Sequence, residues 1–328
     1  MRGHERRTAT RRSPGPLMFG PRYAMARLVA GAVVISFSPV WVTFTATDPT
    51  TTAFYRLAIG GALLLLIVRL RGERIWIRPA LMGAVVVAGT CFAFDLFFWH
   101  RSILYVGAGI STLLANFQVF ILTAVALLVY RQRPGAGQVV AIPLALLGLM
   151  LIVGIDWSVL SPEYRLGVVF GLLTAVSYAG YILGLQLARV RGGGAGSPMR
   201  DIALASLAGA VVLALLTLFT GESLHIPSVR DGLMLTGYSI SATVLGWVLI
   251  SSSLAHISTT RVGLVLLLQP TLAFAWDVLL LGRGFTGTEA LGALIALVAI
   301  WLGSRRDGRA ADQPGSLPAP GAPERPPR

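Results

Sequence analysis

Apolar residues in this chain come in long, nearly unbroken runs, separated by short segments rich in Gly, Pro, Ser, Arg and Asp. A helix that crosses the hydrocarbon core of a bilayer needs about 20 such residues. Lipid offers no partner to backbone groups, so such runs must be helical. The pattern therefore predicts an all-α integral membrane protein with ten transmembrane helices, near residues 27–46, 52–70, 80–102, 106–129, 137–155, 166–188, 201–219, 232–254, 262–281 and 287–304.

The composition supports this interpretation. Hydrophobic residues make up 55% of the 328 residues and charged residues only 12%, with a mean hydropathy of +0.74. Soluble domains are about 45–50% apolar and about 25% charged. A soluble helical core could hardly bury ten such runs. The lipid bilayer is thus the expected surroundings.

The arginines indicate the orientation in the membrane. With the N-terminus inside, 22 of the 27 arginines fall in cytoplasmic segments, four (Arg101, Arg165, Arg230 and Arg283) fall in outer loops, and Arg56 lies within a run. Cytoplasmic loops of membrane proteins are enriched in basic residues. We therefore expect a multi-pass protein of the plasma membrane with both termini cytoplasmic. The net charge of +13 lies in loops and tails, which argues against a nucleic-acid partner.

The chain contains a weak internal repeat. Residues 116–152 align without gaps to residues 267–303, and Gln118 then falls on Gln269. Each half would hold five spans, and an odd number turns the second half upside down, as in many secondary transporters. The prediction is two inverted five-helix repeats at 26–155 and 156–304, flanked by disordered Arg/Pro-rich tails at 1–25 and 305–328.

Sequence motifs of energy-driven or enzymatic chemistry are absent. The chain has no P-loop, no HExxH motif, no nucleophile elbow and no metal-spaced His/Cys set, and its single cysteine is Cys91. We therefore expect no enzymatic activity, no cofactor and no bound metal.

One carboxylate and one guanidinium lie within apolar runs. Asp95 and Arg56 fall at similar depths in the third and second spans, and a charge in the bilayer needs a partner or a role. Two interpretations stay open: an ion pair that fixes the two spans, or a site where Asp95 takes up a proton or meets a cationic substrate group.

Several aromatic residues are further candidates. Trp99 lies one turn from Asp95, and it would either stack on a substrate or belong to the interfacial aromatic belt. Tyr178, Tyr181 and Trp247 would either line a cavity or pack between helices. His100 is expected at the water boundary.

Polar side chains and small residues complete the candidate set. Gln118 and Gln269 recur in the repeat, and they would either bind polar substrate groups or link helices. Asn116 is two residues from Gln118, so the two side chains should point to opposite faces of the helix and should not both line one cavity; the recurrence of glutamine favours Gln118 and Gln269. Ser38 belongs to a "SFSP" sequence that predicts a break in the first span. Gly167, Gly171, Gly180 and Gly184 predict close helix packing, and Asp277 is expected near water or Arg283.

Five stretches resemble a known family: "GAVVISFSPVWV" (31–42), "FYRLAIGGALL" (54–64), "DLFFWHRSI" (95–103), "STLLANFQVF" (111–120) and "LVLLLQPTLAFAWDVLLLGR" (264–283). Together they resemble the EamA-type branch of the drug/metabolite transporter superfamily, over about residues 26–304. The resemblance implies ten helices in two inverted repeats around a central cavity lined mainly by spans one, three, four, six, eight and nine. The "GE" that commonly follows spans four and nine in this family is missing here.

These observations lead to a functional expectation. The chain would be a secondary transporter, exporting a small organic metabolite or drug by alternating access. The alternative is a polytopic membrane protein without transport, such as a scaffold or an enzyme subunit; a channel is disfavoured because no ring of repeated polar motifs occurs. Proton coupling at Asp95 and a homodimer stay open.

Overall fold

The computed structural model describes residues 21–304 except 130, 132–134, 154–159, 192–196, 255, 258–261 and 263–264. This part of the chain is helical and contains no strand. Its elements are η2 (Pro21–Tyr23), α1 (Ala24–Ser36), α2 (Ser38–Phe44), α3 (Pro49–Leu70), α4 (Pro79–Val106), α5 (Ala108–Ala115), α6 (Gln118–Leu128), α7 (Ala136–Val153), α8 (Pro162–Arg191), α9 (Pro198–Thr220), α10 (Val229–Tyr238), the π-helix η4 (Ser239–Leu245), α11 (Gly246–Leu254), α13 (Leu268–Leu279) and α14 (Gly287–Ser304).

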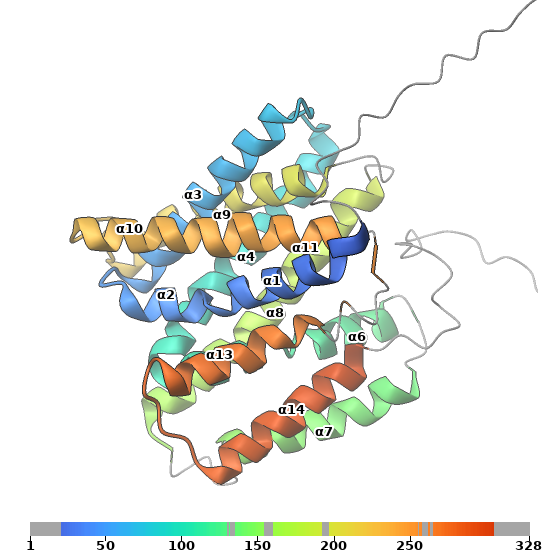
Figure 1. Cartoon of the computed structure of the whole chain (residues 1–328), viewed down its shortest axis with the longest axis vertical. Helices are drawn as coiled ribbons and strands as arrows, with labels where there is room; N and C mark the ends of the chain where they lie inside the picture. Colours follow the sequence, from blue (N-terminus) through green and yellow to red (C-terminus); the bar gives the residue numbers. More distant parts are fainter. Residues whose placement is uncertain are drawn as a thin grey trace, which may run out of the picture.

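The helices run side by side in one bundle (Figure 1). Seven helical segments of the described residues are long and apolar enough to cross a membrane, and Ala136–Ile152 and Gly287–Gly303 form shorter apolar helices. Many large apolar side chains are exposed on the outside of the bundle, among them Leu66, Val211 and Leu218. Such a surface suits lipid rather than water. The chain is therefore a multi-pass membrane protein.

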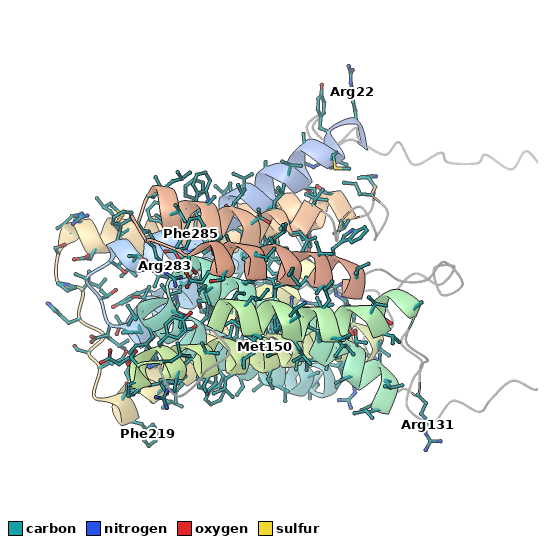
Figure 2. All side chains as sticks on the ribbon, turned by 90° about the horizontal axis from the view of Figure 1, so that it is seen from below. Arg22, Arg131, Met150, Phe219, Arg283 and Phe285 are labelled. Carbon is teal, nitrogen blue, oxygen red and sulfur yellow. The ribbon has the colours of Figure 1, made fainter. Side chains whose placement is uncertain are left out.

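The loops lie at two opposite ends of the bundle. Arg22 and Arg131 lie at one end, and Phe219 and Arg283 lie at the opposite end (Figure 2). Loops before the first and after the fourth apolar run thus lie at one end, and loops after the seventh and ninth runs lie at the other.

Helix α4 is the centre of the larger core, and it packs against α8 and α9 through small residues. A Cβ added at Gly184 of α8 would lie 2.8 Å from the Ala88 Cβ of α4, and one at Gly89 would lie 2.4 Å from the Ala205 carbonyl oxygen of α9. The predicted glycine contacts of α8 are thus confirmed. Close backbone approach of this kind replaces the hydrophobic effect as the source of helix association in lipid.

Helices α7 and α14 form a second pair at one edge of the bundle (Figure 1). Their contact also uses glycines: a Cβ at Gly148 would lie 2.8 Å from the Ala296 nitrogen, and one at Gly292 would lie 2.7 Å from the Gly148 carbonyl oxygen. A smaller core of buried residues joins this pair to α5 and α8.

Among the described residues, four spans are interrupted, the ninth by a turn at Leu267 before α13. The first breaks at Phe37, between α1 and α2, as the "SFSP" sequence predicts, and Pro39 sits in the first turn of α2, where a proline costs no hydrogen bond. The fourth breaks at residues 116–117, between α5 and α6. The eighth changes from α- to π-helical geometry between α10 and α11. Residues beside three of these interruptions (Ser36 and Ser38, Asn116 and Gln118, Leu266 and Gln269) line the cavity described next.

Candidate functional site

A cavity of about 180 Å³ lies where the interrupted spans meet. A water molecule needs roughly 10–15 Å³ of such space, so the cavity has room for about a dozen waters or a small organic molecule. Nine of the ten residues singled out from the sequence line it: Ser38, Arg56, Asp95, Trp99, Asn116, Gln118, Tyr178, Trp247 and Gln269.

Tyr181 is the exception. It is fully buried behind the cavity wall, where its ring stacks on Phe92 at a centroid distance of 4.3 Å. It therefore supports the wall instead of contacting the space. Its neighbour Tyr178, whose ring lies 6.2 Å away, is the member of the pair that lines the cavity.

Asn116 and Gln118 both line the cavity, so the prediction that they point to opposite faces is wrong. That prediction assumed a continuous helix, but the chain turns between α5 and α6. The Asn116 side-chain nitrogen donates to the Thr112 carbonyl oxygen at 2.8 Å, and its backbone nitrogen donates to both Thr112 and Leu113. These bonds close the last turn of α5 and let the chain change direction.

Arg56 of α3 is buried within the bundle, with 7% of its surface exposed. Its Nη1 donates to the Tyr238 hydroxyl at 2.7 Å. Its guanidinium carbon lies 4.9 Å from the centroid of the Tyr238 ring and 5.9 Å from those of Phe92 and Trp99. Three aromatic rings within about 6 Å stabilise the cation through its attraction to their faces.

Asp95 of α4 lines the same cavity and is 7% exposed. In the described part of the chain, it makes no ion pair or hydrogen bond, with Arg56 or with any other residue. The structure thus brings the two charges to one cavity without joining them. The direct ion pair that was one interpretation of the sequence does not form here.

Two aromatic residues that follow Asp95 on α4 are buried. Trp99 is buried at 7% exposure, so it belongs to the cavity wall and not to an interfacial belt. His100 is fully buried instead of lying at the water boundary, and its Nε2 is 3.2 Å from the Tyr238 hydroxyl. The difference at His100 has one cause: α4 continues to Val106, so His100 lies within a helix that packs in the bundle rather than next to a loop.

Sequence reasoning missed Tyr238, which holds Arg56. A tyrosine in an apolar run most often packs through its ring, and nothing in the sequence near position 238 marks it as a polar partner for a residue 182 positions earlier. Trp276 was missed too. Its Nε1 donates to the Ser36 hydroxyl at 3.0 Å, and its ring stacks on Phe37 at 4.5 Å, which links α13 to the break in the first span.

Asp277 is buried at 3% exposure and not interfacial as expected, although its predicted contact with Arg283 does form. Its Oδ2 accepts a hydrogen bond from the Gly109 backbone nitrogen at 2.9 Å and lies 3.4 Å from Arg283 Nη1. The described residues include no cluster of His, Cys, Asp or Glu that could hold a metal ion.

Comparisons with known proteins agree with this architecture. The sequence profile of the EamA-like transporter family matches residues 23–154 and 165–305. The fold is similar to that of a solved structure titled "Crystal structure of protein", with a TM-score of 0.61, 17% identity, and coverage of 86% of this chain and 96% of that chain. A search of curated protein sequences finds no significant match.

A multi-pass helical bundle whose internal cavity is lined by apolar residues with a few charged and polar side chains is an architecture found in secondary transporters. The chain belongs to the EamA-like transporter family, because the two matched regions together cover most of its length. It is thus a membrane transporter of the drug/metabolite superfamily.

Proposed function

We propose that the chain is a secondary transporter that exports a small organic metabolite or drug across the plasma membrane by alternating access. Ten membrane-crossing helices would form two inverted five-helix repeats, at residues 26–155 and 156–304, with both termini cytoplasmic. One observation carries the proposal: two opposite charges and several polar side chains, from both matched regions, converge on one cavity inside an apolar bundle. Charges are costly in a bilayer and usually mark a transport route.

The interrupted spans support the inverted repeat. The break at residues 116–117 precedes Gln118, and a turn at Leu267 precedes Gln269, so the two interruptions share the spacing of the sequence repeat. Both glutamines line the cavity. Broken helices whose inner ends meet at the midplane are the usual construction of a substrate site in repeat-built transporters.

Counterflow in proteoliposomes tests the function. Purified protein is reconstituted in vesicles that are loaded in turn with an unlabelled amino acid, polyamine, nucleoside or lipophilic drug-like cation, and uptake of the same labelled compound is followed. Accumulation above that of protein-free vesicles supports transport. If folded, reconstituted protein moves no member of this panel, the alternative of a polytopic scaffold or enzyme subunit is favoured.

Coupling to protons at Asp95 is tested in the same vesicles. If Asp95 carries the proton, a pH gradient should drive uptake in the native protein, and Asp95→Asn should abolish that drive while leaving exchange without a gradient. Gradient-independent uptake in the native protein would instead indicate uncoupled exchange or facilitated diffusion.

A further inference from the structure

The linker between α9 and α10, residues 221–227, is fastened to the first turn of α3. Glu222 Oε2 accepts a hydrogen bond at 2.7 Å from the Thr50 backbone nitrogen, which belongs to that turn. The Ser223 carbonyl oxygen accepts another at 2.7 Å from the Thr51 hydroxyl. Glu222 thus satisfies a backbone N–H that the helix itself leaves without an acceptor. We call this segment the outer linker.

An ion pair adds to this contact. The second Glu222 oxygen, Oε1, pairs with Arg101 of α4, and both side chains are mostly buried. Arg101 also donates to the Thr50 hydroxyl at 3.0 Å. Charge-assisted hydrogen bonds are stronger than neutral ones, and a pair shielded from water is worth more than an exposed one. One carboxylate therefore joins the outer linker to two helices.

The linker between α3 and α4, residues 72–78, repeats this segment beyond the opposite end of α3. We call it the inner linker. Each linker starts with Gly-Glu, and the two glycines, Gly72 and Gly221, have similar left-handed φ angles of +73° and +70°. More and less exposed residues alternate through both linkers in the same phase. Equivalent positions lie 149 residues apart, so Glu73 corresponds to Glu222.

The same spacing relates the two helices against which these linkers lie. Both α3 and α9 begin with a proline, and the two prolines are again 149 residues apart, so Thr50 corresponds to Met199. The inner linker reaches the start of α9, where the Arg74 carbonyl oxygen accepts from Arg200 Nη1 at 3.4 Å. Each linker thus lies beside the N-terminus of an equivalent helix.

One hydrogen bond of the outer linker is missing at the inner linker. Glu73 Oε2 is buried without a hydrogen-bond partner, while its other oxygen lies 3.5 Å from the exposed Arg71. The Met199 backbone nitrogen, which corresponds to the donor on α3, makes no hydrogen bond within the described residues. A buried acceptor without a donor calls for an explanation, and a helix N–H without an acceptor offers one.

We propose that Glu73 is a latch that binds the Met199 backbone N–H when the inner end of the bundle closes, in alternation with the Glu222 contact at the outer end. The structure then represents the state in which the outer linker is fastened and the inner linker is not. This inference rests on the proposed inverted repeat and alternating access, and it names residues that stabilise each state. Ile250 stands at the position equivalent to Arg101, so the outer contact should be the stronger.

Chemical crosslinking tests this alternation without a substrate. Cys91 is first replaced by alanine, and two cysteine pairs are then introduced separately, Asp48→Cys with Ser223→Cys and Ser197→Cys with Arg74→Cys. The outer pair replaces a 3.2 Å contact between Asp48 Oδ2 and the Ser223 nitrogen, and the inner pair occupies the equivalent positions. A short bis-methanethiosulfonate, which reduction cleaves, is added to reconstituted protein, and the crosslinking rate of each pair is measured.

We expect Glu222→Gln to slow the crosslinking of the outer pair and to speed that of the inner pair. The ratio of the two rates should change roughly tenfold, as the loss of a hydrogen bond between charged groups implies. Arg101→Gln removes the same ion pair from the other side and should act alike. If the outer pair slows while the inner pair stays unchanged, or if neither rate changes, the proposed alternation is wrong.

Glu73→Met tests the inner contact, because methionine keeps the size of the side chain and removes the acceptor. Alone, it should slow the inner pair. Combined with Glu222→Gln, it should return the ratio of rates towards the native value, because both competing states are then weakened. An inner rate that stays as high in the double variant as in Glu222→Gln would show that Glu73 is not the latch.

Controls separate this inference from the transport function. Glu163 is exposed at the start of α8, and Glu163→Met should leave both rates unchanged. Crosslinking the outer pair should abolish counterflow, and reduction should restore it. Counterflow that persists with the outer pair crosslinked would overturn the latch while transport stands. Reciprocal rates in a protein without counterflow would support the latch and count against transport.

Discussion

At the scale of single residues, Asp277 is a buried carboxylate whose charge should contribute to the stability of the fold. It accepts from the Gly109 backbone nitrogen and faces Arg283, so it joins α13 to the start of α5 and to the following loop. Asp277→Asn keeps an acceptor but removes the charge. We expect it to lower the free energy of unfolding by about 1–3 kcal/mol, the usual effect of weakening a buried charged hydrogen bond.

Thermal unfolding in detergent measures this change. Glu73→Gln is the matched control, because its partner Arg71 is well exposed and an exposed pair contributes only about 0–1 kcal/mol. Equal melting temperatures for Asp277→Asn and the native protein would mean that Asp277 stabilises nothing through its charge.

The sequence predicted the polar residues of the site better than their contacts. A charge in an apolar run is conspicuous, so Arg56 and Asp95 could be found without a structure. Which groups they contact depends on helices distant in sequence. The pairing of Arg56 with Tyr238 and the lack of a partner for Asp95 follow from the packing of α3, α4 and α10, which no local pattern encodes.

At the scale of helices, two glycines of the α4–α8 region should respond oppositely to the same substitution. Gly184→Ala places a Cβ 2.8 Å from Ala88 and forces the helices apart, so we expect the melting temperature to fall. Gly83→Ala meets nothing within 4 Å, so alanine's better helix propensity, up to about 1 kcal/mol, should leave the protein as stable or more stable. A neutral Gly184→Ala would contradict the close contact.

Helix interruptions were predictable only where a proline caused them. The sequence around Pro39 predicted the break at Phe37, and that prediction is confirmed. The turn at residues 116–117 follows no Pro or Gly, and it depends on hydrogen bonds of Asn116 to its own helix. The π-helix at 239–245 has no local sequence signal either. It packs closely against α3, where a Cβ added at Gly60 would lie 2.6 Å from the Thr243 Cβ.

At the scale of the whole molecule, the loops should divide between the two sides of the membrane. His225, in the loop between α9 and α10, and Arg71, at the end of α3, are both exposed. After Cys91 is replaced by alanine, we expect His225→Cys to react with a membrane-impermeant maleimide in intact cells, and Arg71→Cys to react only after permeabilisation. The reverse pattern would overturn the proposed orientation, and labelling of both in intact cells would contradict the alternation of spans.

The length and hydropathy of the apolar runs were enough to predict a helical membrane bundle. Both are summed over many residues, so an error at a single position changes them little. The described helices overlap each of the ten apolar runs. Hydropathy does not predict which helices meet around the cavity, because that depends on the packing of the whole chain. The family resemblance implied that arrangement instead.

The π-helical turn of the eighth span has a consequence for register. Its hydrogen bonds span five residues instead of four, so it contains an extra residue relative to an α-helix. It lies between Tyr238, which holds Arg56, and Trp247, which lines the cavity. If this segment changed to α-helical geometry, the helix that follows it would rotate about its axis by about 100° for each residue of shift. Tyr238 would stay beside Arg56, while Trp247 and Ile250 would turn away from the cavity. A change in this one segment would therefore alter two lining residues and leave the Arg56 side of the wall in place.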